Sequence, residues 1–270
     1  MCNETNYNEQ LTVGSWLLHI VNCTLLIEKR MLLQDIRRLV EQGEGETIEF
    51  KRKVAHPDKI VREIVAFANT NGGNLLIGVD DDGSIPGIKF AEEEIFALEQ
   101  AIQRWCRPKL TYHHQTVPIS QKRSVVHYFI HESDRKPHLV LNAALSSSDN
   151  TVQVKSKNQP VPKTSARKSQ RKGIAYVRYQ DQSLQASTEM WQILKQGRRD
   201  RDIRFTYGDK EKLLMQHLEQ HRKITLREFC AAARLPRRVA SRTLVRLVLA
   251  NVLSIIPKEK EDVFIRNFSH

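Results

Sequence analysis

The stretch that most constrains the fold runs over residues 44–87, EGETIEFKRKVAHPDKIVREIVAFANTNGGNLLIGVDDDGSIPG. Polar and apolar residues alternate over residues 47–53, which predicts a strand. Pro57 and the apolar residues that follow it at helical spacing predict a helix. The Asn and Gly residues at positions 69–73 predict its end, because both tolerate a left-handed backbone. The apolar residues 74–79 then predict a strand buried on both faces. We therefore expect strand, helix and strand in succession.

Charge and cysteine content narrow the class of protein. The 270-residue chain has a formal net charge of +12, which favours an anionic partner, with nucleic acid first and an anionic membrane surface second. Residues 11–27 are fairly apolar, but they are interrupted and short for a membrane span, so no membrane partner is expected. The cysteines form no CxxC pair, which predicts free thiols in a reducing cytoplasm and argues against a zinc site: Cys2, Cys23, Cys106 and Cys230.

Shifts in composition divide the chain into parts. Residues 1–30 are predicted to be a poorly ordered N-terminal extension, with Met31 as an alternative natural start. Residues 31–197 are predicted to form the main domain, with a basic flexible insertion at 146–173. The charged residues 198–208 form a linker, and residues 209–270 form a second, smaller domain.

The rest of the main domain follows regular hydrophobic patterns. Helices are expected over 32–43, 91–105 and around 191–194, and strands over 110–119, 124–131, 137–145 and 174–179. The strands at 110–119 and 124–131 are joined through residues 121–123 in the manner of a hairpin.

The insertion concentrates positive charge. Residues 151–173 contain seven Lys or Arg and no Asp or Glu. One interpretation is a flexible loop that binds phosphates and releases counterions, and the other is a solvated insertion between two strands. Under the first, the nucleic-acid-binding candidates are Lys155, Lys157, Arg167, Lys168, Arg171 and Lys172.

The C-terminal part predicts three helices followed by a hairpin. The first helix covers residues 212–221, and the second begins near Thr225, which has Glu228 at capping-box spacing. Pro236 suits the first turn of the third helix. Two short strands follow at 253–256 and 263–266. This order is that of a winged helix-turn-helix.

The third helix carries a basic ridge. Arg238, Arg242 and Arg246 recur at i, i+4 and i+8, with Arg237 beside them. In a winged helix these arginines would face the major groove of DNA. The alternative is a small helical domain with a solvated face, or a wing used for protein contact.

Carboxylates gather near both strands of the opening stretch. Glu44 and Glu49 precede or lie on the first strand, Lys51 follows them, and Asp80 to Asp82 follow the second strand. Such a set can hold a divalent cation and assist phosphodiester hydrolysis. A Glu before a strand and a DDG sequence after one are equally typical of a cap and a turn.

The glycines do not indicate a nucleotide site. No GxxxxGK[ST] motif occurs, and Gly72-Gly73 lacks the following Lys and Ser or Thr that would hold phosphate and magnesium. We expect these glycines to cap the helix. ATP is therefore not expected as a ligand, and no other cofactor is expected of a DNA-binding protein.

Three segments together resemble the Schlafen AlbA-type domain, also catalogued as a divergent AAA or DNA-binding domain. They are GEGETIEFK, AFANTNGGNLLIGVDDDGSIPG and AYVRYQDQSLQAS, and the resemblance covers residues 31–189. It implies an α+β fold, a mixed sheet with packed helices, followed here by a small winged-helix domain. Bacterial chains of this kind resemble predicted transcriptional regulators, which implies DNA as the partner.

The same resemblance implies an alternative function. Vertebrate Schlafen proteins cut tRNA or rRNA with a carboxylate triad, and Glu44 and Glu49 match its two glutamates. Asp80, or less surely Asp81, matches its aspartate, and Mg or Mn would be the metal. The vertebrate nucleases use two such lobes and this chain has one, so a homodimer would have to supply the second. The sequence thus predicts a DNA-binding transcriptional regulator, with a metal-dependent RNA endonuclease as the alternative.

Overall fold

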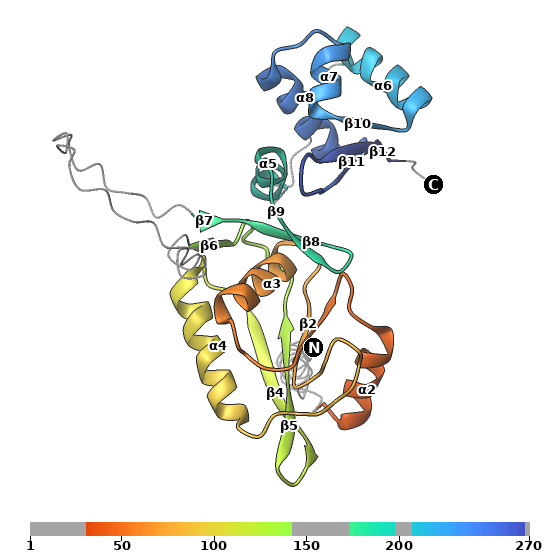
Figure 1. Cartoon of the computed structure of the whole chain (residues 1–270). Coiled ribbons are helices and arrows are strands. Elements are labelled where there is room, and N and C mark those ends of the chain that lie inside the picture. Colours follow the sequence, from red (N-terminus) through yellow and green to blue (C-terminus); the bar gives the residue numbers. More distant parts are fainter. Residues whose placement is uncertain (1–30, 142–172, 198–206, 268–270) are drawn as a thin grey trace, which may run out of the picture.

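The computed structural model describes residues 31–141, 173–197 and 207–267. The expectations for residues 1–30, for nearly all of the basic insertion and for most of the linker lie outside the described residues. The fold is α+β, as predicted, with a larger sheet domain and a smaller C-terminal unit (Figure 1).

A four-stranded mixed sheet in the order β1-β2-β5-β4 is the centre of the larger domain. Its strands are β1 (Ile48–Lys51), β2 (Gly73–Ile77), β4 (Tyr112–Ser120) and β5 (Arg123–Ile130). β1 and β2 are parallel and are joined by α3 (Pro57–Asn69), while β2, β5 and β4 pair antiparallel. The strand, helix and strand expected over residues 44–87 are confirmed, and so is the hairpin that follows.

Helices cover both faces of this sheet (Figure 1). α3 and α4 (Ala91–Trp105) pack on one face through a core that includes Ile64, Leu98 and Tyr128. α2 (Leu33–Gln42) packs on the other face through Ile36, against Phe50 and other residues of the strands. The apolar residues that recur at spacings near 2 in the strands and near 3.6 in the helices therefore lie on the faces that are buried in the core.

The helix end at NTNGG depends on close backbone approach. Gly72 has a φ of +72°, and a Cβ there would lie 2.6 Å from the carbonyl oxygen of Ile130. A Cβ on Gly73 would lie 2.5 Å from the Phe67 ring. Asn69 serves another purpose, because its side chain is buried and donates to the carbonyl oxygens of His138 and Tyr176 at 2.9 and 2.8 Å. The glycines end the helix, as expected, whereas Asn69 bridges separate segments.

Two smaller sheets complete the larger domain. β3 (Cys106–Arg107), β6 (Leu139–Leu141) and β7 (Gly173–Ile174) form one, and β8 (Tyr176–Tyr179) pairs with β9 (Gln182–Gln185) in the other. The prediction of one strand over residues 174–179 is wrong. The chain leaves the first sheet at Ala175, whose carbonyl oxygen accepts from the N–H of Ala186, and the next carbonyl group, that of Tyr176, accepts from Asn69 of α3, on which β8 packs. β3 and β9 were not predicted.

The C-terminal unit contains α6 (Asp209–His221), α7 (Leu226–Ala232) and α8 (Arg237–Leu249) with a three-stranded sheet. Its strands are β10 (Lys223–Thr225), β11 (Leu253–Ile256) and β12 (Val263–Arg266). The predicted capping box is present, since the Thr225 hydroxyl and the Glu228 carboxylate each accept from the other's backbone N–H. β10 was not predicted. Apart from β10, the element order is the one expected, and the identity of this unit as a winged helix stays a prediction.

Two apolar residues of this unit are exposed. Val239 of α8 and Leu213 of α6 are 39% and 46% exposed, whereas Leu214, Ala240 and Leu244 fill the core. Helix α5 (Thr188–Gln196) joins the larger domain to this unit and packs against α8. Within the described ranges, no helix combines the length and the hydrophobicity needed to cross a bilayer.

Candidate functional site

Glu49 lies on β1 and is the centre of a buried charge network. Its residue is 6% exposed, and its Oε2 lies 2.5 Å from Nη2 of Arg178 on β8. Its other carboxylate oxygen pairs with the ammonium group of Lys51, which also donates to the carbonyl oxygen of Phe50 at 2.7 Å. Of the predicted catalytic residues, Glu49 and Lys51 are therefore in contact, but both Glu49 oxygens already face cations.

Arg178 is a site residue that sequence reasoning missed. Its side chain is fully buried, and its guanidinium group lies 5.0 Å from the centre of the Phe67 ring. It donates to the carbonyl oxygen of Gly45 at 2.9 and 3.0 Å and to Oε2 of Glu63 at 2.8 Å. No local signal identified Arg178, because Tyr176 and Val177 lie on opposite faces of β8 and are both buried, so alternation does not distinguish the two faces.

Glu63, on α3, is the second carboxylate that faces Arg178. Burial raises its pKa, and the neighbouring Glu49 carboxylate raises it further. The Ser183 hydroxyl and Arg178 act in the opposite direction. Two carboxylates thus share one guanidinium group in a place with little access for water. Such an arrangement holds β1, α3 and β8 together.

Glu44 lies at the exposed rim of this network. Its Oε1 accepts from the backbone N–H of Phe50 at 2.8 Å. Partial burial raises the pKa of Glu44, and the carboxylates of Glu49 and Asp81 raise it further, against the lowering effects of the Phe50 N–H and of Lys51. The structure therefore brings Glu44, Glu49 and Lys51 into one electrostatic neighbourhood.

Asp80 has different neighbours. Its Oδ2 lies 3.4 Å from Nη1 of Arg52 and 3.4 Å from the Ser84 hydroxyl. Its carbonyl oxygen accepts from the N–H of Gly83, as in a tight turn. Asp81, rather than Asp80, is the aspartate whose charge acts on Glu44. Within the described ranges, no group of three or more His, Cys, Asp or Glu lies close enough to hold a metal ion.

The predicted arginine ridge lies on the surface of α8. Arg237, Arg238, Arg242 and Arg246 are all exposed. The adjacent face of α8 is buried against α5, where the Ser241 hydroxyl donates to Oε1 of Glu189 at 2.6 Å. The remaining candidates of the basic insertion all lie outside the described residues: Lys155, Lys157, Arg167, Lys168, Arg171 and Lys172.

Polar contacts also join the larger domain to the hairpin of β11 and β12. The hydroxyl of Ser187, the N-cap of α5, donates to Oδ2 of Asp262 and accepts from the N–H of Met190. Nζ of Lys258 lies 4.9 Å from the centre of the Tyr179 ring. Burial raises the pKa of Asp262. The hairpin therefore rests on residues next to Arg178 and at the start of α5.

The larger domain matches a known domain family. Residues 44–187, more than half of the chain, match the domain family described as Schlafen, AlbA_2. No curated protein sequence matches the chain.

Two solved structures are similar at low identity. The N-terminal domain of a protein from Nitrosomonas europaea, described as related to the ATP-dependent DNA helicase RecG, shares 19% identity over 49% of this chain and 92% of its own, with a TM-score of 0.33. The DIP2311 protein of Corynebacterium diphtheriae shares 16% identity over 74% of this chain and 32% of its own, with a TM-score of 0.38. The chain thus spans about a third of DIP2311.

Proposed function

Because the chain belongs to the Schlafen, AlbA_2 family, we propose that it binds nucleic acid and acts as a DNA-binding transcriptional regulator. In this proposal the C-terminal unit is a winged helix-turn-helix, and α8 enters the major groove of duplex DNA. The family domain supports nucleic-acid binding in general, while the choice of duplex DNA depends on the C-terminal unit.

The exposed arginines of α8 are the observation that carries the proposal. Arg238, Arg242 and Arg246 occupy one face of a 13-residue helix, and Val239 is exposed beside them. Arginine binds phosphates and forms bidentate hydrogen bonds with guanine, so a row of arginines on one helix face suits the major groove. The 7-residue helix α7 precedes α8 across a short turn, as the helix-turn-helix geometry requires.

A charge-matched pair of variants tests this proposal. The Arg238→Ala/Arg242→Ala protein should bind mixed-sequence duplex DNA at least about tenfold more weakly than the unchanged protein. The reason is that each lost base contact costs about 1–3 kcal/mol of binding free energy. Arg37→Ala/Arg38→Ala removes the same charge from exposed positions on α2 and should bind nearly normally. Equal affinity of both double variants would rule out α8 as the DNA-reading helix.

The second candidate function is cleavage of tRNA or rRNA by a metal-dependent endonuclease. The observation that favours it is the raised pKa of Glu44, to which the neighbouring Glu49 and Asp81 carboxylates contribute after burial, because a carboxyl group with a perturbed pKa beside other carboxylates is typical of hydrolytic sites. The ion pairs of Glu49 with Arg178 and Lys51 do not fit a metal ligand, and this function ranks second for that reason.

Incubation of the full chain with tRNA and Mg²⁺ or Mn²⁺ tests this candidate. Cleavage that is lost in Glu44→Gln and Asp81→Asn, but retained in Asp82→Asn on the same turn, would support it. Glu44 and both aspartates are exposed, so these substitutions leave the core intact. Absence of cleavage with either metal would eliminate the endonuclease candidate.

A further inference from the structure

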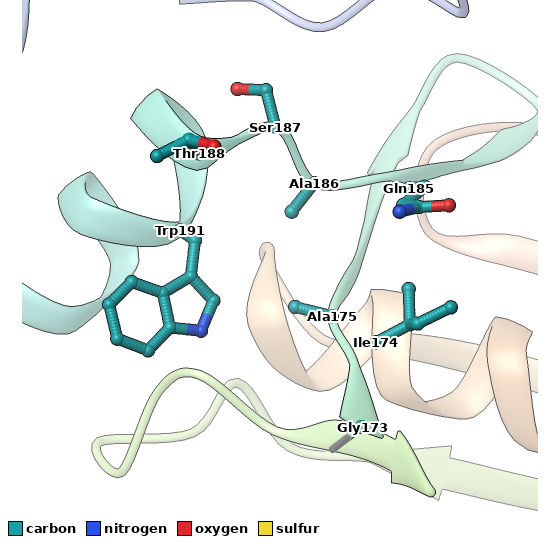
Figure 2. Close-up of a pocket in the computed structure, with 8 residues that line it drawn as sticks. All are labelled: Gly173, Ile174, Ala175, Gln185, Ala186, Ser187, Thr188 and Trp191. Atoms are coloured by element: carbon teal, nitrogen blue, oxygen red, sulfur yellow. The ribbon is translucent and has the colours of Figure 1, made fainter. Parts of the chain in front are cut away.

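A small hollow lies where β7 passes into β8, beside the end of β9 and the first turn of α5 (Figure 2). Its volume is about 240 Å³, below the roughly 300–1,000 Å³ typical of pockets for drug-sized ligands. Its residues include Ile174, Ala175, Gln185, Ala186, Thr188 and Trp191. A hollow of this size is suited to a single ring system.

The indole ring of Trp191 forms one wall of the hollow. Figure 2 shows it lying beside the chain segment that carries Gly173, Ile174 and Ala175. The residue is 37% exposed, although tryptophan offers more apolar area for burial than any other side chain. Ala175 and Ala186 project little from the backbone and leave room for a flat ligand. This wall therefore offers a planar apolar surface to a ligand from solvent.

Polar groups around the hollow are available for recognition. The side chains of Gln185 and Thr188 and the indole N–H of Trp191 make no hydrogen bond within the described part of the chain. Nζ of Lys195, one turn further along α5, lies 4.9 Å from the centre of the Trp191 ring. The site thus combines an aromatic surface with hydrogen-bonding groups at its edge and a cation beside it.

We propose that this hollow binds one unpaired nucleobase of a single-stranded nucleic acid, stacked on Trp191. A nucleobase is planar and carries hydrogen-bonding groups along its edge, which Thr188 on the first turn of α5 can meet. Its backbone phosphate complements the charge of Lys195. Aromatic side chains flanked by cations are the usual means of binding single strands without sequence preference. The inference rests on the proposed nucleic-acid function and adds a second contact, separate from α8, that takes unpaired nucleotides.

Intrinsic fluorescence tests the stacking directly. The chain contains three tryptophans, Trp16, Trp105 and Trp191. In a Trp16→Phe/Trp105→Phe protein, Trp191 is the remaining tryptophan, and oligothymidylate or oligouridylate should quench its emission in a saturable manner. Stacking is worth about 1–3 kcal/mol per base, so Trp191→Ala in the unchanged chain should weaken binding of either oligonucleotide about 5- to 150-fold. Trp191→Phe should retain part of the affinity.

Controls separate this inference from the broader proposal. Phe96→Ala removes another exposed aromatic ring, 67% exposed on α4, and should leave the affinity unchanged. Trp191→Ala should also leave the affinity for blunt duplex DNA unchanged. Suppose that the unchanged chain binds duplex DNA. If the Trp191→Ala protein then binds single strands with unchanged affinity, or loses affinity for single strands and duplex DNA equally, the stacking site is wrong and the duplex-binding proposal stands. If neither duplex nor single strand binds the unchanged chain, both are wrong.

Discussion

Arg178 and Glu49 form a buried ion pair, with Nη2 of the arginine 2.5 Å from Oε2 of the glutamate. The pair joins β8 to β1, two strands that are 129 residues apart in the sequence. The next residue, Tyr179, lies under Lys258 of the C-terminal unit. A single short strand therefore contacts both the carboxylate network and the hairpin of β11 and β12.

Loss of the guanidinium group of Arg178 should destabilise the larger domain strongly. Arg178→Met removes the cation that Glu49 and Glu63 share and leaves Lys51 as the remaining partner of Glu49. Breaking a buried ion pair costs about 3–5 kcal/mol, so urea denaturation should show a loss of unfolding free energy in that range. The triple variant with Glu49→Gln and Glu63→Gln should recover part of the loss.

The control for this variant is Arg38→Ala. Arg38 is an exposed arginine that lies 3.6 Å from Asp35, and its loss should change stability by less than about 0.5 kcal/mol. A loss below about 1 kcal/mol for Arg178→Met would mean that the network does not hold the strands together.

The glycine after α3 is required by geometry. Gly72→Ala places a Cβ in a left-handed backbone and 2.6 Å from the carbonyl oxygen of Ile130. The two costs together predict a loss of about 2–4 kcal/mol in unfolding free energy. Gly45→Ala is the matched control, because a Cβ there meets nothing within 4 Å. Similar thermal midpoints for the two variants would contradict this account of the helix end.

His127 should make the protein sensitive to acid. Burial, and secondarily His113, lowers the pKa of His127 to about 4 from 6.5, and its Nε2 lies 2.8 Å from Oδ1 of Asn74. Between these values the unfolded chain binds a proton that the folded protein does not. Stability is therefore lost as pH falls through this window, by about 3 kcal/mol at most.

Urea denaturation at about pH 7 and about pH 4.5 measures this loss. Carboxylates such as Glu63, whose pKa is raised by burial, also contribute to the pH dependence, so the informative quantity is the difference between the unchanged chain and His127→Gln. The variant should lose less stability on acidification. An identical decrease in both proteins would show that His127 is not held neutral.

The turn between α7 and α8 carries a strained residue. Arg234 has a φ of 51°, a left-handed conformation that costs a side-chain-bearing residue about 1 kcal/mol. Arg234→Gly should relieve this strain and raise the unfolding free energy by several tenths of a kcal/mol up to about 1 kcal/mol. Arg237→Gly, in the first turn of α8, removes the same charge and should be destabilising. The opposite order of thermal midpoints would show that the turn is unstrained.

Local sequence patterns predicted most helices and strands, because hydrophobic spacing and helix caps depend on residues that are close in the sequence. Alternation identified β1 and the hairpin of β4 and β5, and a Thr–Glu capping box marked the start of α7. The strand break at Ala175 could not be predicted in this way. At this point β8 packs on α3 and Tyr176 accepts from Asn69, more than a hundred residues earlier in the sequence, and no local pattern records that contact.

The site was predictable only in part, for the same reason. Glu44, Glu49 and Lys51 are close in sequence, and the structure brings them together. Arg178 reaches Glu49 from a distant strand, so its role depends on tertiary packing. The choice between Asp80 and Asp81 depends on the shape of one tight turn, which directs Asp80 toward Arg52.

The salt dependence of duplex DNA binding is the most direct test of DNA binding through α8. Each phosphate contact adds about 0.9 to the slope of log K against log salt concentration. If α8 binds DNA, the slope for Arg238→Ala/Arg242→Ala should be shallower by about one to two, while Arg37→Ala/Arg38→Ala should keep the original slope. An unchanged slope in the α8 variant, or an equal change in both, would contradict DNA binding through α8.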